Sequence, residues 1–246
     1  MNIIETNVDR LCNMLRLLAE TAGNLNRLKH IDLEEAVNNF DRTFEGVLEA
    51  FHSLYDVTKY NIDYFEHADT ALIILLRNAI HHRDHPLFKS WNAEMNLNKG
   101  YKNYIGAEFL LCSYVPIEKD AHVMKYYYKL ADIYDRIDQS RNSPYLVTRI
   151  STQNMERQLS TMNSELGFNK ICQYATEGHY PLDQIYINIA PILQSGIKRV
   201  FTDLNKKQLS ISGFDSDVYF SFFQKHGFFR LEEIIYFKQR IYLLIE

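Results

Sequence analysis

Two long segments near the start of the chain place apolar residues at the three- and four-residue spacing of an amphipathic helix. The first covers residues 8–28, with Thr6 or Asn7 as its expected N-cap. The second covers residues 33–58 and follows Asp32, whose side chain is well suited to cap a helix. Because the connection between them is short, we expect the two helices to be antiparallel neighbours.

A third helix is predicted over residues 62–84, with Asn61 as its N-cap. Pro86 prevents this helix from continuing much further, because proline lacks a backbone N–H and restricts the residue before it. Residues 71–76 are apolar on every side of the helix. We therefore expect them to be buried, either in the bundle or in a dimer interface.

The pattern is less regular in the rest of the chain. Residues 91–104 are rich in Asn, Lys and Gly and predict a loop, whereas residues 107–115 predict a strand. Residues 205–213 predict a turn or a short strand, and residues 231–245 are too uniformly apolar to assign. Helices are expected over residues 121–137, 150–175 and 182–204, with a bend at Pro191 in the last, and from Asp215 onward.

These elements indicate a mainly α protein: an antiparallel helical bundle with a helical C-terminal extension and at most a small β element. The chain has only 9 glycines and 5 prolines, too few for the frequent turns of an all-β sandwich. We place a helical core at residues 1–90 and an aromatic-rich helical extension at residues 91–246. The extension is expected to pack on the core as one unit.

Composition narrows the class of protein further. Apolar residues make up 46% of the 246 positions, which is typical of a globular chain. The formal net charge of −4 argues against a protein that coats long duplex nucleic acid, so any contact with nucleic acid must be local. The three cysteines are far apart and suggest neither zinc nor disulfides. With no visible signal peptide or membrane span, we expect a cytoplasmic protein without a membrane partner.

The residues best suited to catalysis are concentrated in one short segment. The apolar third helix ends in a cluster of basic and titratable side chains, which comprises Arg77, Asn78, His81, His82, Arg83 and His85. Residues four apart share a helix face, which pairs Asn78 with His82 and Arg77 with His81. Arg77 and His82 are five apart and converge only if the arginine curls round or a second subunit contributes its copy.

These residue types suit cleavage of RNA by general acid–base chemistry. Histidine moves protons near neutral pH, and His82 lies near a helix C-terminus, where the dipole favours the protonated form. Arg77 can hold a phosphate with two hydrogen bonds, and the Asn78 amide can orient a phosphate oxygen or ribose hydroxyl. Arg83, His81 and His85 are candidates for substrate binding. With the ribose 2′-hydroxyl as nucleophile, neither metal nor cofactor is required.

The run from Arg77 to His82 resembles the Arg-Asn-x-x-x-His form of the motif in HEPN domains. The resemblance covers roughly residues 1–90. It implies a helical bundle and a homodimer in which two motifs face each other. It also implies metal-free cleavage of single-stranded RNA to a 2′,3′-cyclic phosphate, with Arg77 and His82 essential and Asn78 their helper. The family includes toxins and abortive-infection proteins of antiviral defence, which implies a cognate inhibitor or activator.

Other interpretations stay open. The same helices can form a catalytically inactive HEPN-like interaction or regulatory protein, with Arg77 and His82 separately engaged in structural salt bridges or buried apart. His81, His82 and His85 can instead hold one transition-metal ion. The run of tyrosines at residues 126–128 either stacks RNA bases or packs in the core, and core packing is the expected role.

Overall fold

The computed structural model describes residues 2–81, 86–118, 122–208 and 211–242. These residues form two compact units, each assembled from separate stretches of the chain. Unit 1 comprises residues 1–78 and 193–228, and unit 2 comprises residues 79–192 and 229–246. The predicted division at residue 90 differs from this arrangement. Unit 1 includes a second segment, which begins more than one hundred residues after the first segment ends.

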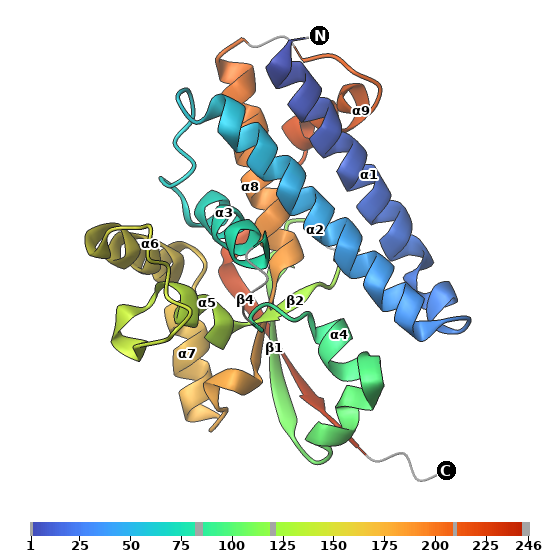
Figure 1. The fold of residues 1–246 in the computed structure, drawn as a ribbon, viewed down its shortest axis with the longest axis vertical. Coiled ribbons are helices and arrows are strands. Elements are labelled where there is room, and N and C mark those ends of the chain that lie inside the picture. Colours follow the sequence, from blue (N-terminus) through green and yellow to red (C-terminus); the bar gives the residue numbers. More distant parts are fainter. Residues whose placement is uncertain (1, 82–85, 119–121, 209–210, 243–246) are drawn as a thin grey trace. The chain divides into compact units, whose positions relative to one another are not determined.

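Two long helices, α1 (Ile3–Lys29) and α2 (Leu33–Thr58), pack side by side in unit 1 (Figure 1). Both begin with side-chain caps. Asn2 and Glu5 form a reciprocal capping box on α1, and Asp32 accepts the backbone N–H of Glu35 on α2. The predicted cap of α2 is thus confirmed, whereas α1 begins five residues before its predicted start.

Unit 1 also contains α9 (Ser216–Lys225) and most of α3 (Ala68–His81) and α8 (Ile189–Lys206). The end of α3 and the start of α8 belong to unit 2. Within unit 1, Asp69 of α3 is almost fully buried. Its carboxylate accepts hydrogen bonds from Ser195 at 2.8 Å and from the Arg199 guanidinium at 3.0–3.2 Å. These contacts fix α3 against α8. Residues 71–76 are all buried, as their composition predicts.

Unit 2 is built on a four-stranded sheet in the order β2-β3-β1-β4 (Figure 1). The two inner strands are parallel, and both outer pairs are antiparallel. Asn188 at the end of β3 is fully buried. Its amide accepts the backbone N–H of Tyr126 and donates to Ser113 Oγ and the Met124 carbonyl. The strands are β1 (Glu108–Pro116), β2 (Tyr127–Lys129), β3 (Ile185–Asn188) and β4 (Phe229–Arg240).

Short helices complete unit 2. An aromatic cluster packs Trp91 edge-on against both Phe109 and Tyr186, whose ring centroids lie 5.0 and 4.8 Å from the indole. The α-helices are α4 (Trp91–Asn96), α5 (Leu130–Ile137), α6 (Thr152–Glu165) and α7 (Phe168–Glu177). The 3-10 helices are η1 (Leu97–Tyr104), η2 (Gln139–Arg141) and η3 (Leu182–Gln184).

The prediction that a helix begins at residue 62 is wrong, because local side-chain hydrogen bonds hold the segment before α3 in turns. Thr70 Oγ1 donates to the carbonyl of Tyr64, and the Tyr64 hydroxyl lies 2.7 Å from Thr58 Oγ1. Asp63 accepts the backbone N–H of Phe65. The bonds to the Tyr64 carbonyl and from the Phe65 N–H satisfy backbone groups that a longer helix would have used, so α3 begins at Ala68 and Asn61 is not its cap.

Several predictions for the second half are also wrong. Residues 182–204 contain a strand directly followed by a helix, and Pro191 lies in the first turn of α8, where its missing N–H costs nothing. Residues 121–137 contain β2 before α5, and residues 150–175 are divided into α6 and α7 at Gly167. Residues 91–104 are mostly helical instead of a loop, with a kink at Asn98 and Lys99, whose φ angles are positive. Most of the unassigned segment 231–245 belongs to β4.

The mainly α prediction is confirmed, together with the strand predicted over residues 107–115. The C-terminal extension contains a four-stranded sheet, so it is not simply helical. Among the described residues, no helix combines the length and apolar composition needed to cross a membrane.

Candidate functional site

Arg77 and Asn78 occupy the last part of α3, where its apolar stretch ends. Both side chains are half-buried, and only 19% of the arginine side chain is accessible to solvent. Arg77 Nη1 donates to Asn78 Oδ1 at 3.4 Å. The two candidate phosphate-binding side chains are therefore in contact with each other at the end of one helix.

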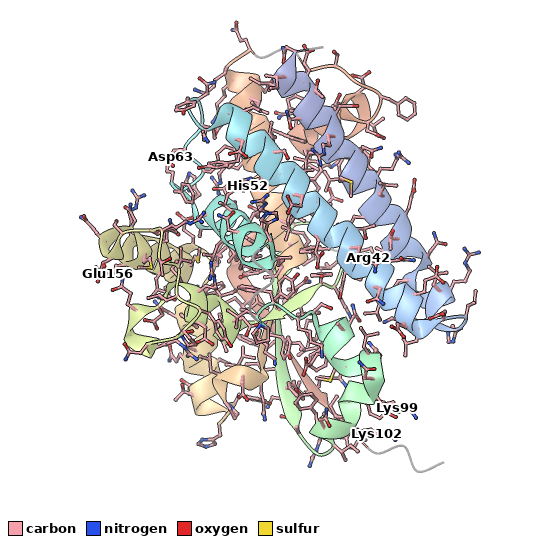
Figure 2. The ribbon with its side chains drawn as sticks, in the orientation of Figure 1. Arg42, His52, Asp63, Lys99, Lys102 and Glu156 are labelled. Carbon is pink, nitrogen blue, oxygen red and sulfur yellow. The ribbon has the colours of Figure 1, made fainter. Side chains whose placement is uncertain are left out.

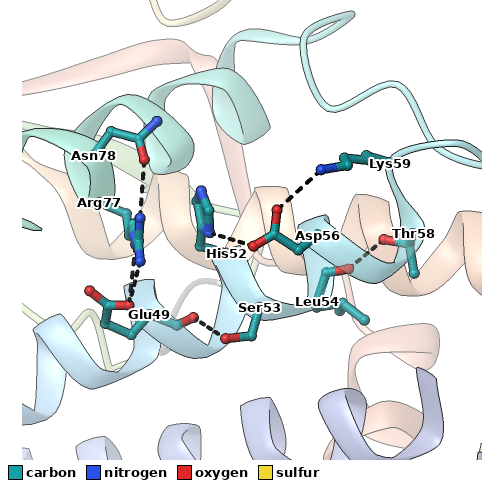
Figure 3. A network of polar contacts seen from close by, with 9 residues as sticks. All are labelled: Glu49, His52, Ser53, Leu54, Asp56, Thr58, Lys59, Arg77 and Asn78. Atoms are coloured by element: carbon teal, nitrogen blue, oxygen red, sulfur yellow. Dashed lines mark hydrogen bonds and ion pairs between the residues drawn. The ribbon is translucent and has the colours of Figure 1, made fainter. Parts of the chain in front are cut away.

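The Arg77 guanidinium also binds α2. Its Nε and Nη2 atoms donate to Glu49 Oε2 at 3.2 and 3.0 Å (Figure 3). Both bonds reach the same oxygen of the carboxylate, and 40% of the Glu49 side chain is exposed. One edge of the guanidinium is thus held by an anion that has access to solvent.

A histidine lies on the same stretch of α2 as Glu49. His52 is labelled on α2 in Figure 2, and Figure 3 shows it between the Arg77–Glu49 pair and Asp56. His52 Nδ1 lies 3.3 Å from Asp56 Oδ2, and Lys59 Nζ lies 3.4 Å from Asp56 Oδ1. Only 14% of the His52 side chain is exposed.

The surroundings of His52 favour its neutral form. Burial lowers the pKa of His52 first, and the positive charge of Arg77 lowers it further. The carboxylates of Asp56 and Glu49 act in the opposite direction but do not reverse the shift. His52 is therefore an uncharged imidazole near neutral pH and can accept a proton.

The other predicted site residues lie further along the motif. His81 is exposed and is the last residue of α3. His82, Arg83 and His85 lie outside the described residues. The alternative metal site includes two of these three. Among the residues that the structure describes, no group of three His, Cys, Asp or Glu side chains is placed to hold a metal ion.

The tyrosines at residues 126–128 pack in the core of unit 2. Their exposed fractions are 1%, 6% and 1%, which leaves no ring face for an RNA base. The Tyr126 and Tyr128 rings meet edge to face at a centroid distance of 5.3 Å. Core packing, the role expected from the sequence, is thus confirmed.

Sequence reasoning missed the α2 side of the cluster. Glu49, His52 and Asp56 stand at positions i, i+3 and i+7, which places them on one helix face. This row of polar residues can be recognised in the sequence, beside the apolar face of the same helix. We use the name α2–α3 cluster for Glu49, His52, Asp56, Arg77 and Asn78, which all belong to unit 1.

Comparisons of the chain with protein-family models, with curated proteins and with solved structures found no match. The resemblance to the HEPN family stays a prediction that rests on residues 77–82.

Proposed function

We propose that the protein is a metal-independent endoribonuclease of the HEPN type. It cleaves single-stranded RNA by attack of the ribose 2′-hydroxyl on the adjacent phosphate, which leaves a 2′,3′-cyclic phosphate. Arg77 and Asn78 bind the scissile phosphate, and His82 transfers a proton. His81, Arg83 and His85 contact the RNA on either side.

The observation that carries this proposal is the half-buried Arg77 guanidinium in contact with the Asn78 amide at the end of α3. Partial burial strengthens the attraction between a guanidinium and a phosphate, because less water screens the two charges. The histidines of the motif follow directly in the sequence. The site has arginine, amide and imidazole groups within six consecutive residues, and this reaction requires no further cofactor.

The same proposal includes the biological setting implied by the motif. The protein acts as a homodimer in a toxin or anti-phage system, in the cytoplasm, and a cognate protein inhibits or activates it. The formal charge of −4 agrees with a substrate contact limited to a small basic region.

A second candidate function is a catalytically inactive helical regulator. The Arg77–Glu49 ion pair favours it, because this pair links α3 to α2 and occupies the arginine that a substrate would need. In that case Arg77 is a structural residue, and its replacement lowers stability without any effect on RNA.

The test is cleavage of single-stranded RNA in excess EDTA by wild type and by the His82→Ala variant, with analysis of the product ends. We expect wild type to leave 2′,3′-cyclic phosphate ends and the variant to lose about 10²- to 10⁴-fold in rate. The exposed His122, which lies outside the motif, provides the matched control His122→Ala, and this variant should cleave like wild type.

Equal rates for wild type and His82→Ala would remove His82 from the mechanism. Loss of cleavage on addition of EDTA would establish a metal-dependent site instead. If wild type cleaves no RNA, alone or with its cognate activator, the regulator becomes the better explanation.

A further inference from the structure

The α2–α3 cluster contains a histidine outside the motif, and its geometry suits a specific step of the reaction proposed above. We propose that the cluster is a phosphate-ester site in which His52 is a catalytic residue that accepts the proton of the attacking 2′-hydroxyl. The inference rests on the proposed function for its substrate. Its evidence is the contacts of Arg77 with Glu49 and of His52 with Asp56, and of these four residues only Arg77 belongs to the motif.

The contact with Asp56 determines which nitrogen of His52 is basic. A carboxylate 3.3 Å from Nδ1 favours the tautomer that carries its proton on Nδ1. Nε2 then holds the free lone pair. Asp56 also interacts with Lys59 at 3.4 Å, which holds the carboxylate from its other side. His52 is thereby oriented by a partner on its own helix, in the way that a general base requires.

Arg77 provides the phosphate contact next to this base. The guanidinium presents Nε and Nη2 toward Glu49, and this edge is the one that can grip two phosphate oxygens. Glu49 is the anion that occupies the edge in the absence of substrate. Because 40% of its side chain is exposed, its carboxylate can move into water when a phosphate replaces it.

The atoms of the step balance within this arrangement. The 2′-oxygen attacks phosphorus, and its proton passes to His52 Nε2. The bond between phosphorus and the 5′-oxygen then breaks, and the leaving oxygen takes a proton from a general acid, the role of His82 in the proposed function. The products are a 2′,3′-cyclic phosphate and a free 5′-hydroxyl, with no change of oxidation state.

The charges around His52 also suit a base. Arg77 and Lys59 lower the pKa of this imidazole, while Asp56 and Glu49 raise it, and burial makes the net shift downward. A neutral imidazole near neutral pH is ready to accept a proton without first losing one. Removal of the Asp56 carboxylate should lower the pKa of His52 further.

The first experiment measures the site without any catalysis. Inorganic phosphate is titrated into the full chain while histidine ring resonances are followed by NMR, with sodium chloride at matched ionic strength as the control. We expect the His52 resonances to shift and saturate, and those of the exposed His122 to stay unchanged. Arg77→Lys should weaken phosphate binding about 10-fold, because lysine lacks the two-pronged geometry of arginine. Glu49→Gln should strengthen it.

The second experiment measures the pH dependence of kcat/KM for a single-stranded RNA. His52→Gln is expected to lower kcat/KM by about 10²- to 10⁴-fold. In the Asp56→Asn variant, the acidic limb of the pH profile of kcat/KM should move to lower pH. A purely structural role for His52 would not cause this shift. Circular dichroism and thermal unfolding of each variant show whether it has folded.

The outcomes separate the two proposals. RNA cleavage that persists unchanged in His52→Gln overturns this inference and leaves the proposed function intact. Resonances of His52 that do not respond to phosphate overturn the inference as well. Phosphate binding at His52 in a wild type that cleaves no RNA supports the anion site and overturns the ribonuclease function.

Discussion

Among single residues, Asp132 of unit 2 is another group whose ionisation is altered by burial. Its side chain accepts the backbone N–H of Phe88 at 2.7 Å, and Phe88 has the left-handed φ of 62° that non-glycine residues rarely adopt. Burial raises the pKa of Asp132 to about 6. The carboxyl therefore holds the chain just after Pro86 in an unusual conformation. Because it is buried, its ionised form lowers the stability of the folded state.

This raised pKa predicts a pH dependence of stability. The folded state binds a proton more tightly than the unfolded chain, so the contribution of Asp132 is fully present below about pH 4 and is lost as the pH rises through about 6. Asp132→Asn keeps an acceptor for Phe88 without the charge. It should increase the free energy of unfolding at pH 8, by at most about 3 kcal/mol, and change it little at pH 4.

Urea unfolding at both pH values measures this effect. The control is Asp183→Asn, at an exposed aspartate, which should change stability little at either pH. An Asp132→Asn variant less stable than wild type at pH 8 would contradict the prediction.

At the scale of helices and strands, the N-cap of α2 gives a direct test of the local signals. Asp32→Ala removes the acceptor of the Glu35 N–H, whose distance to Asp32 Oδ1 is 2.9 Å, and should cost about 1 kcal/mol. Asn61→Ala is the matched control, because Asn61 was the predicted cap of a helix that begins only at Ala68. Chemical denaturation should show a loss for the first variant and a change below about 0.5 kcal/mol for the second.

Gly167 provides a second test at this scale, because it separates α6 from α7. Its φ is 64°, and an added Cβ would lie 2.7 Å from Ile234 Cδ1. Gly167→Ala should therefore destabilise the protein by about 1–2 kcal/mol. In contrast, Gly23→Ala in α1 meets no atom within 4 Å and should gain up to about 1 kcal/mol of helix propensity. Thermal unfolding of both variants measures these changes in stability. Changes of the same sign in the two variants would contradict the prediction.

The sequence predicts well the elements that have one apolar and one polar face. Helix α2 is such an element, and its bounds agree with the prediction. Strand β3 is buried on both faces and continues directly into α8, so its periodicity cannot be distinguished from that of a buried helix. For the site, the motif indicates Arg77 and Asn78, but the contact of Arg77 with Glu49 of α2 depends on tertiary packing that no local pattern encodes.

At the scale of the whole molecule, each unit is completed by a segment distant in the sequence. Unit 1 requires residues 193–228, and unit 2 requires β4, which pairs with β1 along most of its length. A division of the chain at one point therefore leaves both units incomplete. This organisation follows from long-range contacts and was not visible in the composition or the periodicity.

A fragment of residues 1–90 tests this organisation. It lacks α8 and α9, so Asp69 loses both Ser195 and Arg199, and the apolar residues of α3 lose the cover of Gly196 and its neighbours. We expect the fragment to show no cooperative thermal transition and to bind a dye for exposed apolar surface. A chain that joins residues 1–78 to residues 193–228 through a flexible linker should unfold cooperatively. Cooperative unfolding of the 1–90 fragment would contradict this prediction.

Because unit 1 is assembled from two separate segments of the chain, its helices are synthesised at different times. Once α3 has been made, the ribosome must add roughly 110 further residues before α8 begins to cover it, which takes about 5 to 22 s at typical translation rates. During this interval the apolar stretch from Ala71 to Leu76 has not yet met its partner helix. The nascent chain therefore has a period of exposure to aggregation and to chaperones, and its length depends on how quickly residues 79–192 are translated.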